Sequence, residues 1–558
     1  MQTLQTLDYV SIAVYMALMA GIGLLLGGLV KDVGAYFKAG GTLPWVAAAI
    51  SNYMSMFSAF IFVAYAGIAY QDGLVAITVV WCTVPPALLG AALFGPRWRR
   101  AGIMTPVEYL ETRFNAPVRQ FFSWGGIGFG VLNNMVRLYA IGIFISGATP
   151  LSLEVSILVA GVIVVLYTFL GGLWAVVLTD TVQFVVLIFT TLILLPLALN
   201  AVGGLGGLRE ALPDHFSFFR GPKGAPLYLL AYYTMISIKY NGNWSFIQRF
   251  YSVRDEAAGR KMGLLMAALF LVFPFFFLLP AMAARVVVPD LADPQTAYAA
   301  IALRLLPPGI MGLMMAAMFA ATMSAVDSEL NVTAGVFVRD VYERHLRPAA
   351  SPGELMWVAR GTTLVVGGLI VAGAMFVSHI GGAFEANKLL TALIGIPLAI
   401  PLVMGIVLRP PRPWGAIAAV LVGVAAGVVL NLHPEVSWPW ATLTVIGLTL
   451  ATLLVSGLIP SRDAGYRQRV DDLFARLATP VADDEKPVPE PGFRRALTVL
   501  LAVALAAAGA LFVAMSLPSL GELSGMLALT AGLVCCSLAL FVFRNAHGPA
   551  ETPGHTLS

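Results

Sequence analysis

The stretch AISNYMSMFSAFIF (residues 49–62) interrupts a long apolar run that begins near Leu43. Four polar side chains break the middle of this run: Ser51, Asn52, Ser55 and Ser58. A second apolar run is broken in the same way by YNGNWS (240–245). Because lipid cannot solvate loose backbone, non-helical chain survives at membrane depth only where it is buried in protein or lines a wet cavity. The two breaks therefore indicate a binding site near the middle of a membrane.

The composition places the rest of the chain in the membrane as well. Of its 558 residues 59% are apolar and only 11% are charged, which is too apolar for a soluble domain. A membrane helix needs about 20 mostly apolar residues. About 15 spans are predicted, near 8–29, 45–71, 76–94, 118–148, 153–171, 174–200, 226–246, 262–285, 308–338, 357–378, 385–405, 414–432, 437–458, 495–515 and 522–543. We expect an all-α polytopic protein of the cell (inner) membrane, with the lipid bilayer as its surroundings.

Positive charge gathers in alternate loops, after the first, third, seventh, ninth, eleventh and thirteenth predicted spans. Loops rich in Lys and Arg stay on the cytoplasmic side, so we expect the N-terminus outside and the C-terminus in the cytoplasm. The charges counted in these loops are Lys31 and Lys38, then Arg97, Arg99, Arg100 and Arg113, then Arg249, Arg254, Arg260 and Lys261, then Arg339, Arg344 and Arg347, then Arg409 and Arg412, and last Arg462, Arg467, Arg469, Arg476, Lys486, Arg494 and Arg495.

Each of the two breaks opens a group of five spans, and because five is odd the two groups have opposite orientations. This arrangement predicts an inverted repeat. The expected divisions are an N-terminal extra helix and first cytoplasmic loop over 1–44, a first repeat over 45–225, a second repeat over 226–408, two further helices over 409–459, a cytoplasmic linker over 460–494, and two C-terminal helices with a short tail over 495–558.

Five strings carry a resemblance to a known family, and they occur in the family's order. They are GTLPWVAAAISNYMSMFSAFIFVAYAGIAYQDG (41–73), MTPVEYLETRF (104–114), YTFLGGLWAVVLTDTVQ (167–183), NWSFIQRFYSVRD (243–255) and AATMSAVDSELNVTAGVFVRDVY (320–342). Over roughly Leu7 to Arg412 the chain resembles the sodium:solute symporter family, which includes sodium/glucose, proline and sialic acid carriers. The resemblance implies a LeuT-like inverted-repeat core, alternating access, and symport of a small-molecule solute with sodium.

The resemblance also implies where sodium binds. Backbone carbonyls of Met54 and Phe57, at the first break, would face the carbonyl of Ala321 and the hydroxyl of Ser324. Sodium is a hard cation that prefers oxygen ligands, and unwound backbone supplies them without burying a net charge. The family usually has a second hydroxyl directly after Ser324, whereas this chain has Ala325. The site is therefore expected to lack one oxygen.

A polar stripe surrounds this position. Ser324, Asp327, Ser328 and Asn331 fall on one face of a helix, and such a stripe faces protein or water rather than lipid. Asp180, Asp327 and Ser328 are candidates for a secondary cation or proton site. The alternative for the stripe is hydrogen bonding between helices, and the alternative for Asp180 is a solvated carboxylate at the membrane interface.

Arg137 and Lys239 are the clearest indications of the solute. An ionisable side chain in mid-span is costly and by default functional, and Arg can bind a carboxylate through two parallel hydrogen bonds. The expected lining is otherwise partly apolar, with Ile61, Ile236 and Phe270 where sugar-carrying relatives have polar residues. A hydrophobic lining with one or two cations favours a small carboxylate over a sugar. The predicted substrate residues are Ser58, Ile61, Asn133, Arg137, Lys239 and Asn243.

Two other roles are open for these cations. Either Arg137 or Lys239 pairs internally with Asp327 or Glu385, or Lys239 acts as a tethered cation that replaces a sodium ion. For the whole protein, a proton-coupled or sodium-independent carrier of the same fold is the first alternative. A membrane-embedded sensor or enzyme is the second, although the sequence shows no convergent catalytic side chains.

Other classes of ligand find no support in the sequence. The three cysteines all lie in apolar spans and form neither a disulfide framework nor a metal pattern. The histidines show no zinc spacing, so sodium is the only metal ion expected, and no other cofactor is. No feature indicates nucleic-acid binding. We expect a transporter and not an enzyme.

Overall fold

A computed structural model describes residues 4–27, 39–170, 173–461, 463–487 and 491–546. The predicted loop charges Lys31, Lys38 and Arg462 lie outside these residues. The described residues form helices, with one isolated β-bridge and no strand. The α-helices are α1 (Thr6–Gly27), α3 (Trp45–Met56), α4 (Ala66–Asp72), α5 (Val75–Val80), α6 (Val84–Leu89), α7 (Gly95–Ala101), α8 (Tyr109–Arg113), α9 (Ala116–Ala148), α10 (Leu153–Leu170), α11 (Leu173–Ala201), α12 (Gly204–Ala211), α13 (Pro226–Asn241), α14 (Trp244–Ser252), α15 (Glu256–Val287), α16 (Ala297–Leu305), α17 (Ile310–Val336), α18 (Pro352–Ala374), α19 (Gly382–Leu390), α20 (Ile396–Gly405), α21 (Pro413–Asn431), α22 (Trp438–Ser456), α23 (Ala464–Ala478), α24 (Pro491–Ser516) and α25 (Leu523–Ala546).

The all-α polytopic fold is confirmed. Among the described residues, 11 helices are long and apolar enough to cross a membrane, and a bent pair brings the number to 12. All fifteen predicted ranges contain helix. Three of them, around α1, α10 and α13, fall short of this test in length or composition, which accounts for the lower count.

Both predicted breaks are present. α3 ends at Met56, Phe57 is extended (φ −96°, ψ 132°), and the chain resumes at an angle of 57°. The second break lies between α13 and α14, where the Asn243 side chain caps α14 by accepting a hydrogen bond from the Phe246 N–H at 2.9 Å. The Leu43 N–H donates to the Ser252 carbonyl at 3.1 Å, so the start of the first broken segment is tied to the end of the second.

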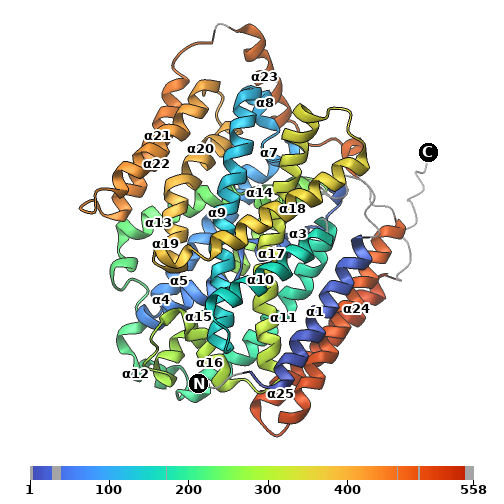
Figure 1. Ribbon diagram of the computed structural model, residues 1–558. Coiled ribbons are helices and arrows are strands. Elements are labelled where there is room, and N and C mark those ends of the chain that lie inside the picture. The colour runs from blue at the N-terminus through green and yellow to red at the C-terminus, as the bar shows by residue number, and fades with distance from the viewer. Residues whose placement is uncertain (1–3, 28–38, 171–172, 462, 488–490, 547–558) are drawn as a thin grey trace, which may run out of the picture.

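α17 is the central helix of the bundle (Figure 1). Every one of its residues is buried, and it packs against α1, α3, α9, α10, α11, α14 and α18. A helix that is buried all round faces protein on every side. Polar side chains on α17 therefore point at other helices or at internal cavities, and not at lipid.

The flanks of the bundle are less deeply buried. α24 and α25 form a hairpin beside α1 at one edge, and α21 and α22 lie together at the opposite edge (Figure 1). The stretch expected to be a linker, 460–494, contains α23. The apolar residues of α23 recur every three or four positions and are buried against the bundle: Tyr466, Val470, Leu473, Phe474 and Leu477. α1 begins near the lower end of Figure 1, and α25 ends about halfway up its right edge.

The placement of two arginines in loops is wrong, because Arg113 and Arg249 are fully buried. Arg113 donates hydrogen bonds to the Tyr466 hydroxyl and to four backbone carbonyls at the end of α20 and just beyond it, those of Gly405, Leu408, Arg409 and Pro411. Arg249 lies in α14, inside the bundle. The short helices α8 and α14 fold back into the protein, which hydropathy along the sequence does not reveal.

An ion-pair network joins the start of α9 to the π-helical end of α17, Phe337–Leu346. The buried Asp340 carboxylate pairs with Arg119 and accepts a hydrogen bond from the Thr105 hydroxyl at 3.0 Å. Arg119 also pairs with Glu111 at 2.9 Å, and Arg344 pairs with Glu111 at 2.5 Å. Burial alone would raise the pKa of Glu111, but the hydrogen bonds from the two arginines hold it below its usual value. The network fixes this end of the bundle.

Candidate functional site

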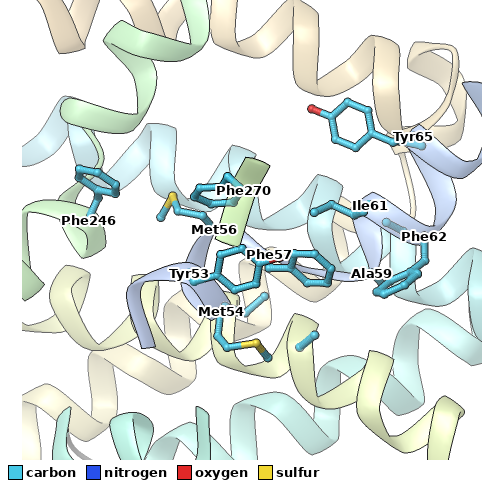
Figure 2. Close-up of a cluster of buried hydrophobic side chains, with 14 of the residues drawn as sticks. Tyr53, Met54, Met56, Phe57, Ala59, Ile61, Phe62, Tyr65, Phe246 and Phe270 are labelled. Atoms are coloured by element: carbon cyan, nitrogen blue, oxygen red, sulfur yellow. The ribbon is translucent and has the colours of Figure 1, made fainter. Parts of the chain in front are cut away.

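Aromatic side chains pack around the first break (Figure 2). The Tyr53 ring lies 5.3 Å from that of Phe57 and 4.7 Å from that of Phe270, and the Phe57 ring lies 4.8 Å from that of Phe277. All four are buried. These rings hold the unwound residues in one conformation, because a well-packed core side chain has few alternative positions.

The first break lies directly against α17. The Ala59 N–H donates to the Thr322 hydroxyl at 2.9 Å, and the hydroxyls of Ser55 and Ser328 are 2.9 Å apart. Thr322 and Ser55 are site residues that the sequence reasoning missed, although hydroxyls beside a predicted break are a usable signal. These two contacts join the break that contains Met54 and Phe57 to the helix that contains Ala321 and Ser324, and the sodium site between them stays a prediction.

Oxygen atoms without partners mark the interior of this crossing. The Ser324 hydroxyl lies near the Asp180 carboxylate. Among the described residues, neither the Ser324 hydroxyl nor Asp180 Oδ1 has a hydrogen-bond partner of normal length. The Met54 carbonyl accepts from the Phe57 N–H at 3.1 Å. Ala325 is fully buried and adds only a methyl group. A buried oxygen without a partner is costly, which favours a bound cation.

Asp180 is completely buried, so its interpretation as a solvated interfacial carboxylate is wrong. Its Oδ2 accepts a hydrogen bond from the Ser51 hydroxyl at 2.5 Å and lies 4.0 Å from Arg249 Nη2. Arg249 also donates to Ser51 at 3.1 Å and to Ser328 at 2.7 Å. Ser51 thus links the buried cation to the buried anion, and one oxygen of Asp180 stays open.

The polar stripe of α17 divides between neighbouring helices. Ser328 faces α3 and α14, and Asn331 accepts from the Gln248 side chain at 3.3 Å. Asp327 lies against the Thr168 hydroxyl of α10. Hydrogen bonding between helices, the alternative weighed for this stripe, therefore accounts for Asn331 and for part of Ser328.

All six predicted substrate residues line one pocket: Ser58, Ile61, Asn133, Arg137, Lys239 and Asn243. Ile236 also lines the pocket, as expected. Phe270 does not, because its ring lies behind the pocket against Tyr53.

Arg137 presents part of its guanidinium group to this pocket. Its Nη1 donates to the Asn134 side chain and to the Ala325 carbonyl, both at 3.1 Å. A guanidinium has five N–H donors in a planar fork, and within the described residues Nε and Nη2 make no hydrogen bond. Arg137 therefore offers one edge to a ligand, while Nη1 holds α17 beside the predicted sodium site.

Lys239 is buried and bound by neutral groups. Its ammonium donates to the Asn387 side chain at 2.7 Å and to the Thr391 hydroxyl at 2.9 Å. An ammonium has three donors, so one remains for the pocket. Lys239 lines the same pocket as Met56 and Ser58 of the first break, and its role as a tethered cation that replaces a sodium ion stays a prediction.

The expected internal ion pairs are absent among the described residues. Glu385 pairs with Lys388, and neither Arg137 nor Lys239 lies within 4.0 Å of a carboxylate there. The carboxylate that acts on both cations is Glu329, which sequence reasoning missed. Its Oε1 accepts hydrogen bonds from Asn243 and Ser245.

A second cavity adjoins the first and shares Asn133, Lys239 and Asn243 with it. Its other lining residues include Gly126 of α9 and Leu402 of α20. Glu329 also lines this second cavity. The three shared polar residues therefore lie where the two cavities meet.

Comparisons with known proteins agree with this geometry. The model of the sodium:solute symporter family matches residues 36–423. A sodium/glucose cotransporter of Vibrio parahaemolyticus is 26% identical, over 86% of this chain and 92% of its own length. Sodium/myo-inositol cotransporter 2 of Sus scrofa is 30% identical, over 77% of this chain and 70% of its own length.

A solved structure shares the fold. It is a sodium-coupled sialic acid symporter in a substrate-bound, outward-open state, 21% identical, with a TM-score of 0.72 over 82% of this chain and 98% of that one. The LeuT-like core and the transporter class are thus confirmed, and the enzyme alternative is set aside. With the family model matching most of its length, the chain belongs to the sodium:solute symporter family.

Proposed function

We propose that this protein imports a small organic carboxylate together with sodium, by alternating access. The observation that carries the solute class is the pair of cations in one pocket, Arg137 and Lys239, neither of which has a carboxylate partner among the described residues. Buried charges are normally paired or bound to a ligand. A solute carboxylate supplies the missing partner.

The charge count favours a single negative charge on the solute. Arg137 and Lys239 carry formal charges of +1 each, and Glu329 beside them carries −1. The sum is +1, which one carboxylate neutralises. The open edge of Arg137 can bind both carboxylate oxygens, and the free ammonium donor of Lys239 can bind one of them.

The two cations are the feature of this pocket that favours an anionic solute. The apolar residues Ile61, Val136 and Ile236 share the wall with seven neutral polar residues: Ser58, Tyr65, Thr83, Asn133, Tyr240, Asn243 and Asn387. The carboxylate proposal therefore rests on Arg137 and Lys239, and not on a shortage of polar groups in the lining.

Sodium is the proposed coupling ion, held between the break at Met54–Phe57 and the segment Ala321–Ser324. Two contacts that join the break to α17, and the unpartnered Ser324 hydroxyl, support this position. Coupling is reciprocal, so sodium and solute raise each other's affinity by the same factor. Arg137 touches the solute pocket and the Ala325 carbonyl, and it provides a direct link between the two sites.

A proton-coupled carrier is the second candidate. The methyl group of Ala325 at the expected sodium site and the buried carboxylate of Asp327 favour it. Solute uptake by the protein in liposomes separates the two candidates. Uptake driven by sodium at constant pH supports the first, and uptake driven by a pH gradient in sodium-free buffer supports the second.

The test uses the full chain in liposomes. A thermal-shift screen of carboxylic acids, each with its uncharged carboxamide as the matched control, identifies the solute. We expect stabilisation by an acid and not by its amide, stronger in sodium than in choline. Sodium-dependent uptake of a sugar or polyol, with no response to any acid, would refute the carboxylate assignment and leave the family intact.

Membrane potential gives an independent check of solute charge. Moving one net charge inward gains about 2.3 kcal/mol per 100 mV. One sodium ion carried with one monocarboxylate moves no net charge, so uptake at this ratio is insensitive to potential. We also propose the orientation with the N-terminus outside, and inverted repeats over 45–225 and 226–408.

A further inference from the structure

α1 lies outside the part of the chain that the family model matches, residues 36–423. It is nevertheless not a peripheral addition. α1 packs against α17, α11 and α24, and it runs beside the α24–α25 hairpin (Figure 1). Tyr15 and Met19, one turn apart on its inner face, are fully buried.

The register of α1 against α17 is fixed by Asp8. Its Oδ1 accepts hydrogen bonds from the Gly309 N–H at 2.7 Å and the Gly312 N–H at 2.8 Å, which satisfies the free amides at the start of α17. The backbones are in close contact, since a Cβ on Gly312 would lie 2.1 Å from the Ser11 hydroxyl oxygen. α1 therefore cannot slide along α17.

Tyr15 follows Asp8 by two helical turns and carries a hydroxyl without a partner. Among the described residues, its oxygen forms no hydrogen bond although the side chain is fully buried. α1 packs against both α11, which carries Asp180, and α17, which carries Ser324, and the Asp180 carboxylate is close enough to Tyr15 to act on its hydroxyl electrostatically. Among the described residues, Asp180 Oδ1 and the Ser324 hydroxyl also have no hydrogen-bond partner of normal length. A buried polar atom is costly to leave unpaired, and the two hydroxyls together with the open oxygen of Asp180 point to an oxygen-lined position.

We propose that the Tyr15 hydroxyl is a ligand of the cation that binds at Asp180 and Ser324. This inference rests on the proposed cation coupling. It assigns a binding role to α1, a helix outside the two repeats. The ligands are all oxygens, as a hard cation requires. Asp180 can serve because Ser51 and Arg249 engage only its other oxygen, Oδ2.

Tyr15→Phe tests the proposal, because it removes the hydroxyl and keeps the ring. The matched control is Tyr298→Phe, since Tyr298 is also fully buried and its hydroxyl has no hydrogen-bond partner of normal length among the described residues. Tyr298 lies on α16, beside Thr191, and not at Asp180. Solute uptake by the full chain in liposomes is measured against sodium concentration, and then against solute at saturating sodium.

We expect Tyr15→Phe to raise the half-saturating sodium concentration about tenfold. This is the loss of affinity expected when one ligand contact, comparable in energy to a hydrogen bond, is removed. The solute affinity at saturating sodium and the control variant should not change. The sodium-induced rise in unfolding temperature, relative to each protein's own value in choline, gives a second readout that is independent of transport rate.

Two outcomes would overturn the assignment. If the wild type responds to sodium and Tyr15→Phe responds with the same half-saturation, the Tyr15 role is refuted while the carrier function stands. If uptake and thermal stability of the wild type are indifferent to sodium, the proposed sodium coupling is refuted together with this inference.

Discussion

Replacement of Arg137 by Gln isolates the contribution of the guanidinium fork to solute binding. In the structure its Nε and Nη2 are open to the pocket, while Nη1 is bound to Asn134 and to the Ala325 carbonyl. A bidentate carboxylate would form two charge-assisted hydrogen bonds, each contributing about 1.5–3 kcal/mol. At the lower value for each of the two bonds, the loss is about 3 kcal/mol. This corresponds to roughly a 150-fold rise in half-saturating solute.

The assay is sodium-driven uptake of the acid found in the screen, with binding measured in parallel by thermal shift. Arg137→Lys retains the charge but only one contact, so about a tenfold loss is expected. The exposed Arg347→Gln is the control for the loss of a positive charge far from the pocket. An unchanged half-saturation for the acid in Arg137→Gln would refute the reasoning. So would an equal loss for an uncharged analogue.

Three further predictions follow from the same contacts. Lys239→Gln should weaken binding of the acid at least tenfold by removing the second cation, with uptake kinetics as the measurement; unchanged kinetics would exclude contact with the solute. Ala325→Ser should lower half-saturating sodium about tenfold by adding an oxygen, whereas an unaltered sodium titration would show that this position does not face the ion. Asp340→Asn should destabilise the protein by about 3 kcal/mol, because Arg119 loses its buried partner and keeps only the partly exposed Glu111. Glu111→Gln should cost about 1 kcal/mol or less. Thermal unfolding in detergent compares the last two, and equal shifts would contradict the difference in burial.

The residues predicted for the substrate site lie together in one pocket, and sequence reasoning could group them because the signals for them are local. Hydroxyls within an apolar run predict a broken helix wherever they occur, since lipid offers no partner for free backbone groups. Arg137 and Lys239 stand out for a similar reason, as ionisable side chains in mid-span. The structure places them with Ser58 and Asn243 in one pocket, although their roles there remain predictions.

The partners of the buried charges could not be derived in the same way. Arg249 follows an apolar run and was counted as a loop charge, yet α14 folds inward and brings it to Asp180, 69 residues earlier in the chain. Glu329 lies on α17 but is not part of the predicted polar stripe of that helix. Only the packing of the helices shows that it faces Asn243.

The sequence by itself determined that this protein is a helical membrane carrier with two broken helices, and it indicated the family. These features depend on hydropathy and on residues close together in the chain. The tertiary structure decided which buried groups are paired and which are open, including the free edge of Arg137 and the unpartnered hydroxyl of Tyr15. The physical reason is that burial and pairing are properties of neighbouring helices, and neighbours such as α1 and α17 are about 300 residues apart in sequence.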